Sequence, residues 1–175
     1  MKQSFSAKRA AMGGIFIAAA LIFSYVESLI PFHFGVPGMK LGLANIVIVT
    51  GLYFLNLPDI CLISGIRILV AGLLFGNLMS LLYSFAGGLL SLAAMILIKR
   101  TGKFSVTGVS ITGGVFHNTG QIIAAIAVTG VSAILYYLPV LIGTGIVTGF
   151  IMGLLSGRIL SVLNKSFKIS QYAQK

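Results

Sequence analysis

The sequence is poor in charge, above all in negative charge. Glu27 and Asp59 are its only acidic residues, and charged residues of both signs make up 8% of the chain. A soluble domain carries about 25% charged residues to cover its surface. Because 58% of the residues are apolar, water cannot solvate this chain on all sides. We expect one integral membrane domain over residues 1–175, with the lipid bilayer as a partner.

Residues that carry chemistry are scarce as well. Cys61 is the only cysteine, which rules out an internal disulfide and a cysteine metal cluster. His33 and His117 could join it and the two carboxylates, but no metal-ligand spacing is present. The chain lacks a phosphate-binding G-x-x-x-x-G-K-[ST] loop, a serine nucleophile elbow and paired carboxylates. A single aspartate cannot build the aspartate-rich site that holds a diphosphate through magnesium. We therefore expect no enzyme, no metal site and no intrinsic cofactor.

What the sequence does contain is long apolar runs. A membrane-spanning helix needs about 20 mostly apolar residues. Breaks at proline, glycine and charge divide the chain into six runs, which are 10–30, 41–57, 60–76, 78–98, 109–130 and 134–163. The first run follows a basic start but lacks a small-residue cleavage site, so we interpret it as an uncleaved span. Continuous rather than alternating runs argue against a β-barrel. The predicted fold is an all-α bundle of six transmembrane helices.

The positive charge is unevenly placed along these runs. The chain has 12 Lys and Arg residues, giving a net charge of +10. All except Lys40 and Arg67 lie before the first run, between the fourth and fifth, or near the end of the last. Flanking charge of this kind marks cytoplasmic loops rather than a nucleic-acid interface. It predicts a multi-pass protein of the bacterial cell membrane with both termini in the cytoplasm, and no nucleic-acid partner.

Two runs carry ridges of small residues, which let another helix backbone approach closely. In the last run glycine recurs every four residues, at Gly145, Gly149, Gly153 and Gly157. This ridge packs either inside the bundle or against another subunit. The ridge of the first run consists of Ala7, Ala10, Ala11, Gly14 and Ala18. Its spacing alone leaves the same two interpretations open.

Polar side chains inside the runs are candidates for a binding site. A central Arg costs about 2.5–3.5 kcal/mol on insertion scales, so it needs a partner or a wet cavity. Arg67 lies inside the third run, and the fifth contains His117, Asn118 and Gln121 on one broad helix face. These three either line a ligand cavity or form interhelical hydrogen bonds. By depth, we expect Gln121, Asn118 and Arg67 to bind ligand and His117 to affect stability.

Several motifs resemble one known family. They are ESLIP at the end of the first run, PGMKLGLANI after it, and a late G-x-FHN-x-GQ. On these motifs the chain resembles the family known both as Gx transporters and as heptaprenyl diphosphate synthase component I, over about residues 7–163. That family is similar to the S components of energy-coupling factor (ECF) importers. S components are six-helix membrane proteins that bind a vitamin or related small molecule near the outer face.

The resemblance implies a lid, a ligand site and a partner surface. Residues 31–39 would form the lid, in which Phe32 and Phe34 cover a ring and His33 supplies a titratable group. Glu27 and Lys40 flank the lid and either pair with each other or contact a polar ligand, and Asn45 is a further candidate. The first-run ridge would contact a membrane scaffold subunit driven by two ATPases. Glycine at position 14 departs from the alanine pattern, and no S-component substrate signature is present.

Three functions are compatible with these features. The leading hypothesis is the substrate-binding subunit of an ECF-type importer for a small, ring-containing molecule such as a flavin, a quinone precursor or a vitamin. The alternative is a non-catalytic membrane partner in prenyl diphosphate or quinone biosynthesis. A third is an accessory of flavin- or quinone-linked membrane electron transfer.

Overall fold

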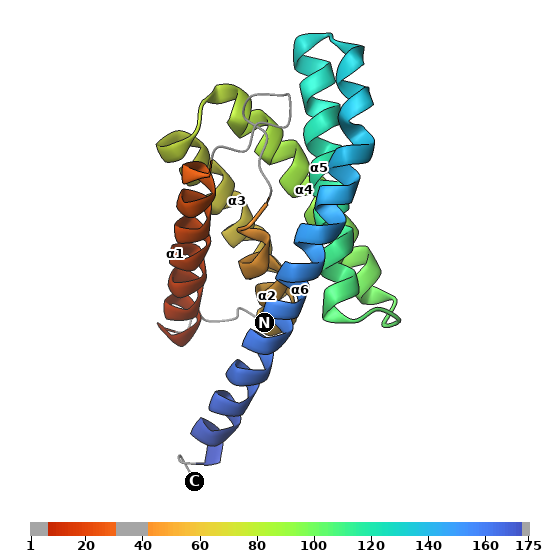
Figure 1. The fold of residues 1–175 in the computed structure, drawn as a ribbon. Helices are drawn as coiled ribbons and strands as arrows, with labels where there is room; N and C mark the ends of the chain where they lie inside the picture. The colour runs from red at the N-terminus through yellow and green to blue at the C-terminus, as the bar shows by residue number, and fades with distance from the viewer. Residues whose placement is uncertain (1–6, 31–41, 173–175) are drawn as a thin grey trace.

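The computed structural model describes residues 7–30 and 42–172, which form six α-helices, one short 3-10 helix and no strand (Figure 1). The elements in chain order are α1 (Ala7–Leu29), α2 (Asn45–Phe54), α3 (Leu57–Phe75), α4 (Leu78–Arg100), α5 (Val106–Thr129), η1 (Ser132–Tyr137) and α6 (Leu138–Tyr172). The prediction of an all-α protein with six helices is confirmed. The boundaries differ from the expected ones by a few residues, except that α6 continues well past residue 163.

Short polar segments begin and end these helices. The side chain of Asn77 accepts a hydrogen bond from the backbone N–H of Ser80 (2.8 Å) at the start of α4. Ser105 does the same for Gly108 (3.2 Å) at the start of α5. Such caps satisfy amide groups that have no partner within the helix. Gly130 ends α5 with a φ of 71°, a left-handed conformation that favours glycine. The links from α2 to α3, from α3 to α4 and from α4 to α5 are short, so these consecutive helices run antiparallel.

Five helical segments are long and apolar enough to cross a membrane: α1, α3, α4, α5, and η1 together with α6. Their outward faces carry large apolar side chains, and Leu73 and Tyr136 are 75% and 87% exposed. Soluble monomers rarely expose apolar surface on this scale. Length, composition and surface are those of a multi-pass membrane protein.

α2 departs from the prediction. We expected a second span over residues 41–57, but the helix covers ten residues, or about 15 Å. The hydrocarbon core of a bilayer is about 30 Å thick. The helix starts late because Gly42 takes a φ of 81° and leads a turn, and it ends early because Leu55 is extended. The expected span is therefore corrected to a short helix, buried on all sides from Asn45 to Leu52.

Glycine allows close contacts between the backbones of α5 and α6. α5 and α6 pack against each other more extensively than any other pair of helices. A Cβ atom added at Gly145 would lie 2.8 Å from the carbonyl oxygen of Gly114, and one at Gly153 would lie 2.6 Å from Cα of Thr107. α6 starts beside α5, passes α2 and extends beyond the other helices toward the C-terminus (Figure 1).

α1, α3 and α5 begin at the same end of the bundle (Figure 1), and most Lys and Arg residues lie in or near the helix ends found there. We call this the basic end; its described members are Arg9, Lys99, Arg100, Lys103 and Lys165, whereas Arg158 lies higher on α6, two residues after the contact of Ser156 with α2. The opposite end carries no Lys or Arg among residues 7–30 and 42–172, and Arg67 lies within α3. This asymmetry agrees with the charge distribution of the sequence.

An ion pair joins α1 to α3 at the basic end. Two nitrogens of the Arg9 guanidinium contact the Asp59 carboxylate, Nη2 at 2.6 Å from Oδ1 and Nε at 2.9 Å from Oδ2. Both residues lie in the first turn of their helices, which start at the same end. The two-pronged geometry fixes the position of α1 relative to α3.

Candidate functional site

Glu27 holds the start of α2. Its buried carboxylate, near the end of α1, accepts hydrogen bonds from the backbone N–H groups of Gly42 and Leu43, the latter at 3.2 Å. Amides that precede a helix have no partner within it, and a negative charge near a helix N-terminus is favourable. At the other end of α2, the Lys99 ammonium donates to the carbonyl oxygen of Leu52 (2.5 Å). The short helix thus has an anion at its N-terminal end and a cation at its C-terminal end.

Arg67 lies deep in the bundle beside Glu27. Its side chain is 6% exposed, and within the described residues its Nε has no hydrogen-bond acceptor. It lines a cavity of about 10 Å³, together with Glu27, Ser24 of α1, Ser84 of α4, His117 of α5, Ile68 and Ala71. The hydroxyl groups of Ser24 and Ser84 are also buried without a hydrogen-bond partner among the described residues.

This polar cavity is small. Its volume is about that needed for one water molecule. Ligand sites are typically about 300–1,000 Å³. Its residues can therefore hold a water molecule or one small polar group of a larger ligand. No three His, Cys, Asp or Glu side chains gather to hold a metal ion in residues 7–30 and 42–172.

The polar residues of α5 point in two directions. The Nε2 atoms of His117 and Gln121 lie 2.9 Å apart, and His117 borders the polar cavity. Asn118 turns toward α6, where its amide nitrogen donates to the carbonyl oxygen of Leu141 (2.6 Å). Sequence reasoning placed these three side chains on one face. In the structure His117 lines this cavity, whereas Gln121 and Asn118 do not.

The remaining candidates divide into three groups. Lys40 and the lid residues Phe32, His33 and Phe34 lie outside the described residues. Asn45 is buried in the first turn of α2. The ridge of α1 is exposed at Ala7, Ala10, Ala11, Gly14 and Ala18. A Cβ atom added at Gly14 would meet nothing within 4 Å, so a partner helix could approach closely there.

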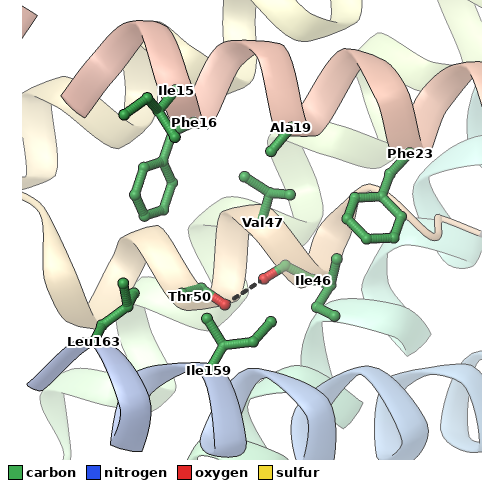
Figure 2. Close-up of a pocket in the computed structure, with 9 residues that line it drawn as sticks. All are labelled: Ile15, Phe16, Ala19, Phe23, Ile46, Val47, Thr50, Ile159 and Leu163. Carbon is green, nitrogen blue, oxygen red and sulfur yellow. Dashed lines mark hydrogen bonds between the residues drawn. The ribbon is translucent and has the colours of Figure 1, made fainter. Parts of the chain in front are cut away.

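An apolar groove of about 200 Å³ lies between α1, α2 and α6 (Figure 2). Ile15, Phe16, Ala19 and Phe23 of α1 form one wall. Ile159 and Leu163 of α6 form the other, with Ile46, Val47 and Thr50 of α2 between them. α1 and α6 do not pack against each other, so the groove separates two helices that share only α2 as a neighbour.

The comparison with protein-family models gives one result. Residues 16–159 match the model described as heptaprenyl diphosphate synthase component I. The chain belongs to this family. No curated protein and no solved structure matches it. The matched range extends from the wall of the groove at Phe16 to its other wall at Ile159, and it contains every residue that lines the polar cavity.

Sequence reasoning missed two features of the site. The groove depends on the angle between α1 and α6, which hydropathy does not report. The ion pair of Arg9 with Asp59 could have been predicted, because alternating spans place the start of the first and third helices at the same membrane face. Since the chain has two acidic residues, each is a strong candidate for a partner of a buried or half-buried cation.

Proposed function

We propose that this chain is a non-catalytic membrane subunit of a prenyl diphosphate synthase. Family membership carries the proposal, because component I is by its name one part of a larger enzyme. Two acidic residues in 175 are too few for a magnesium–diphosphate site of the aspartate-rich kind. Catalysis therefore belongs to another subunit, and this chain contributes membrane attachment and contact with the apolar product.

The exposed ridge of α1 is the proposed contact with the partner. Its small side chains present a nearly flat helix surface, which suits close packing against another helix. The basic end would face the cytoplasm, following the excess of Lys and Arg. In a bacterial cell this orientation places the first turns of α1 and α3, where the ridge begins, on the cytoplasmic side.

Purification from the native membrane tests the proposal. The tagged chain would be extracted in mild detergent, and co-purifying proteins would be identified by mass spectrometry. We expect a prenyltransferase subunit, and we expect the complex to elongate farnesyl diphosphate with labelled isopentenyl diphosphate. Recovery of the chain without any prenyltransferase or elongation activity would contradict the proposal.

The polar cavity supports a second candidate, the substrate-binding subunit of an ECF-type importer. Arg67, Ser24 and Ser84 offer buried hydrogen-bonding groups in a cavity that also includes Glu27, near the end of α1. Buried polar atoms of this kind are costly unless something satisfies them. The same purification distinguishes the two functions, since an importer would retain a scaffold subunit, two ATPases and a small ring-containing solute. Arg67→Ala should then weaken solute binding measured by calorimetry, whereas it should leave prenyl elongation unchanged.

A further inference from the structure

We propose that a pocket at the basic end, between α2, α3 and α4, binds the phosphate headgroup of an anionic phospholipid. The pocket has a volume of about 160 Å³, and the residues that line it are Leu52, Leu55, Leu57, Ile96, Lys99 and Arg100. The site requires only that the chain lies in a membrane, so it is independent of the proposed role in a prenyl diphosphate synthase.

The two cations of the pocket have no anionic partner in this chain. Lys99 and Arg100 stand in the last turn of α4. The sequence has two acidic residues, of which Asp59 is held by Arg9 in a two-pronged contact. Glu27 lies near the far end of α1, where it holds the start of α2. The positive charge of the pocket is therefore balanced from outside the chain, and the occupant is an anion.

Both cations have N–H donors to offer. An ammonium group has three, and one of those on Lys99 goes to the carbonyl oxygen of Leu52 (2.5 Å). The same Nζ lies 4.7 Å from the centre of the Tyr53 ring, and these two contacts hold it in place. The exposed Arg100 guanidinium makes no hydrogen bond or ion pair within residues 7–30 and 42–172. Its planar fork of donors matches the oxygens of a phosphate group.

The rest of the lining selects a lipid over a free phosphate ion. Its four other side chains are leucine and isoleucine, contributed by the end of α2, the start of α3 and the last turns of α4. A free phosphate would lose hydration against these side chains without gaining hydrogen bonds. The glycerol and first methylene groups of a phospholipid would instead pack against them.

The depth of the pocket fits a headgroup as well. α4 has 23 residues, or about 35 Å, slightly more than the roughly 30 Å of the hydrocarbon core. Its last turn therefore reaches the headgroup layer, where basic pockets between membrane helices bind anionic lipids. The pocket is smaller than the roughly 300–1,000 Å³ of sites that enclose a whole ligand, so it takes the headgroup and leaves the acyl chains in the bilayer.

Native mass spectrometry of the full-length, delipidated protein tests the proposal. The protein would be titrated with phosphatidylglycerol and with phosphatidylcholine of the same acyl chains, because only the former has a net negative charge. Arg100→Gln removes the exposed cation of the pocket. Lys103→Gln is the matched control, since Lys103 is exposed in the following loop and does not line the pocket. Leu57→Trp fills the pocket from the first residue of α3, and Leu78→Trp places the same ring at the first residue of α4.

We expect the wild type to bind phosphatidylglycerol more tightly than phosphatidylcholine by on the order of tenfold. Arg100→Gln should weaken phosphatidylglycerol binding about fivefold, which corresponds to about 1 kcal/mol for one cation near an anionic lipid. Leu57→Trp should weaken it as well. Lys103→Gln and Leu78→Trp should bind like the wild type, and so should the wild type in the presence of equimolar inorganic phosphate or farnesyl diphosphate.

Four results would overturn the inference. Equal binding of the two lipids would mean that the pocket does not recognise charge. Equal effects of Arg100→Gln and Lys103→Gln would mean that the lipid binds the whole basic end rather than the pocket. Displacement of phosphatidylglycerol by inorganic phosphate would identify a site for a free anion. Displacement by farnesyl diphosphate would assign the pocket to a prenyl substrate.

Discussion

Replacing Gly149 by alanine is expected to separate α5 from α6. The new methyl carbon would lie 2.6 Å from Cα of Ile111 and 2.8 Å from the carbonyl oxygen of Ser110. Carbon atoms are in favourable contact at about 3.5–4.0 Å, so the helices must move apart by roughly 1 Å. Both clashing atoms belong to a helix backbone, which cannot turn aside as a side chain can.

The size of the effect follows from two opposing terms. Overpacking a tight contact costs about 1–3 kcal/mol. Alanine also returns up to about 1 kcal/mol, because it favours a helix more than glycine does. Gly157→Ala, on the same ridge, gains helix propensity without the cost of overpacking, because a Cβ atom there would meet nothing within 4 Å. The difference in unfolding free energy between the two variants therefore measures the cost of the clash alone.

The measurement is unfolding by sodium dodecyl sulfate in mixed micelles, followed by circular dichroism. We expect Gly149→Ala to be less stable than Gly157→Ala by about 1–3 kcal/mol. Equal stability of the two variants would refute the backbone contact between α5 and α6. It would also remove the argument that the ridge of α6 packs inside the bundle up to Gly153.

Three shorter predictions follow from other features. Gly14→Leu should leave the melting temperature unchanged but release the partner subunit in a pull-down, because Gly14 faces open space; a partner that stays bound would contradict this use of the α1 ridge. Asp59→Asn should lower thermal stability in detergent by breaking the pair with Arg9, and exchanging the two residues should restore it; a failed rescue would point to another role for Asp59. With the native cysteine removed, a cysteine at Lys103 should react with an impermeant maleimide only in inside-out vesicles, and one at Gly130 only in intact cells; the reverse would invert the orientation.

The sequence was sufficient to predict elements that depend on local composition. α4 begins at Leu78 as expected, because Asn77 caps it and an unbroken apolar run follows. Hydropathy identified residues 41–57 as apolar and predicted a membrane span there, whereas the structure has a helix of ten residues. An apolar run records that a segment avoids water, and a short buried helix satisfies that condition as well as a span does.

The candidate site was less predictable, because it depends on how helices face one another. The sequence indicated Glu27 and Arg67 separately as candidates. In the structure both line one cavity, although they are forty residues apart in the sequence. The turn of Asn118 toward Leu141 is set by the glycine contacts of α5 with α6, not by spacing within α5. Sequence periodicity places a residue on a helix face; the neighbour of that face comes from the packing of the whole bundle.

The short length of α2 has a consequence for biogenesis. At about 15 Å, the segment is too short to enter the bilayer as an independent span during synthesis. Its ends depend on Glu27 and Lys99, and the carbonyl oxygen of Ile46 accepts a hydrogen bond from the hydroxyl of Ser156, 110 residues later. α2 can therefore reach its final position only after the ribosome has produced α6, so the chain inserts its long helices first and closes around its shortest one last.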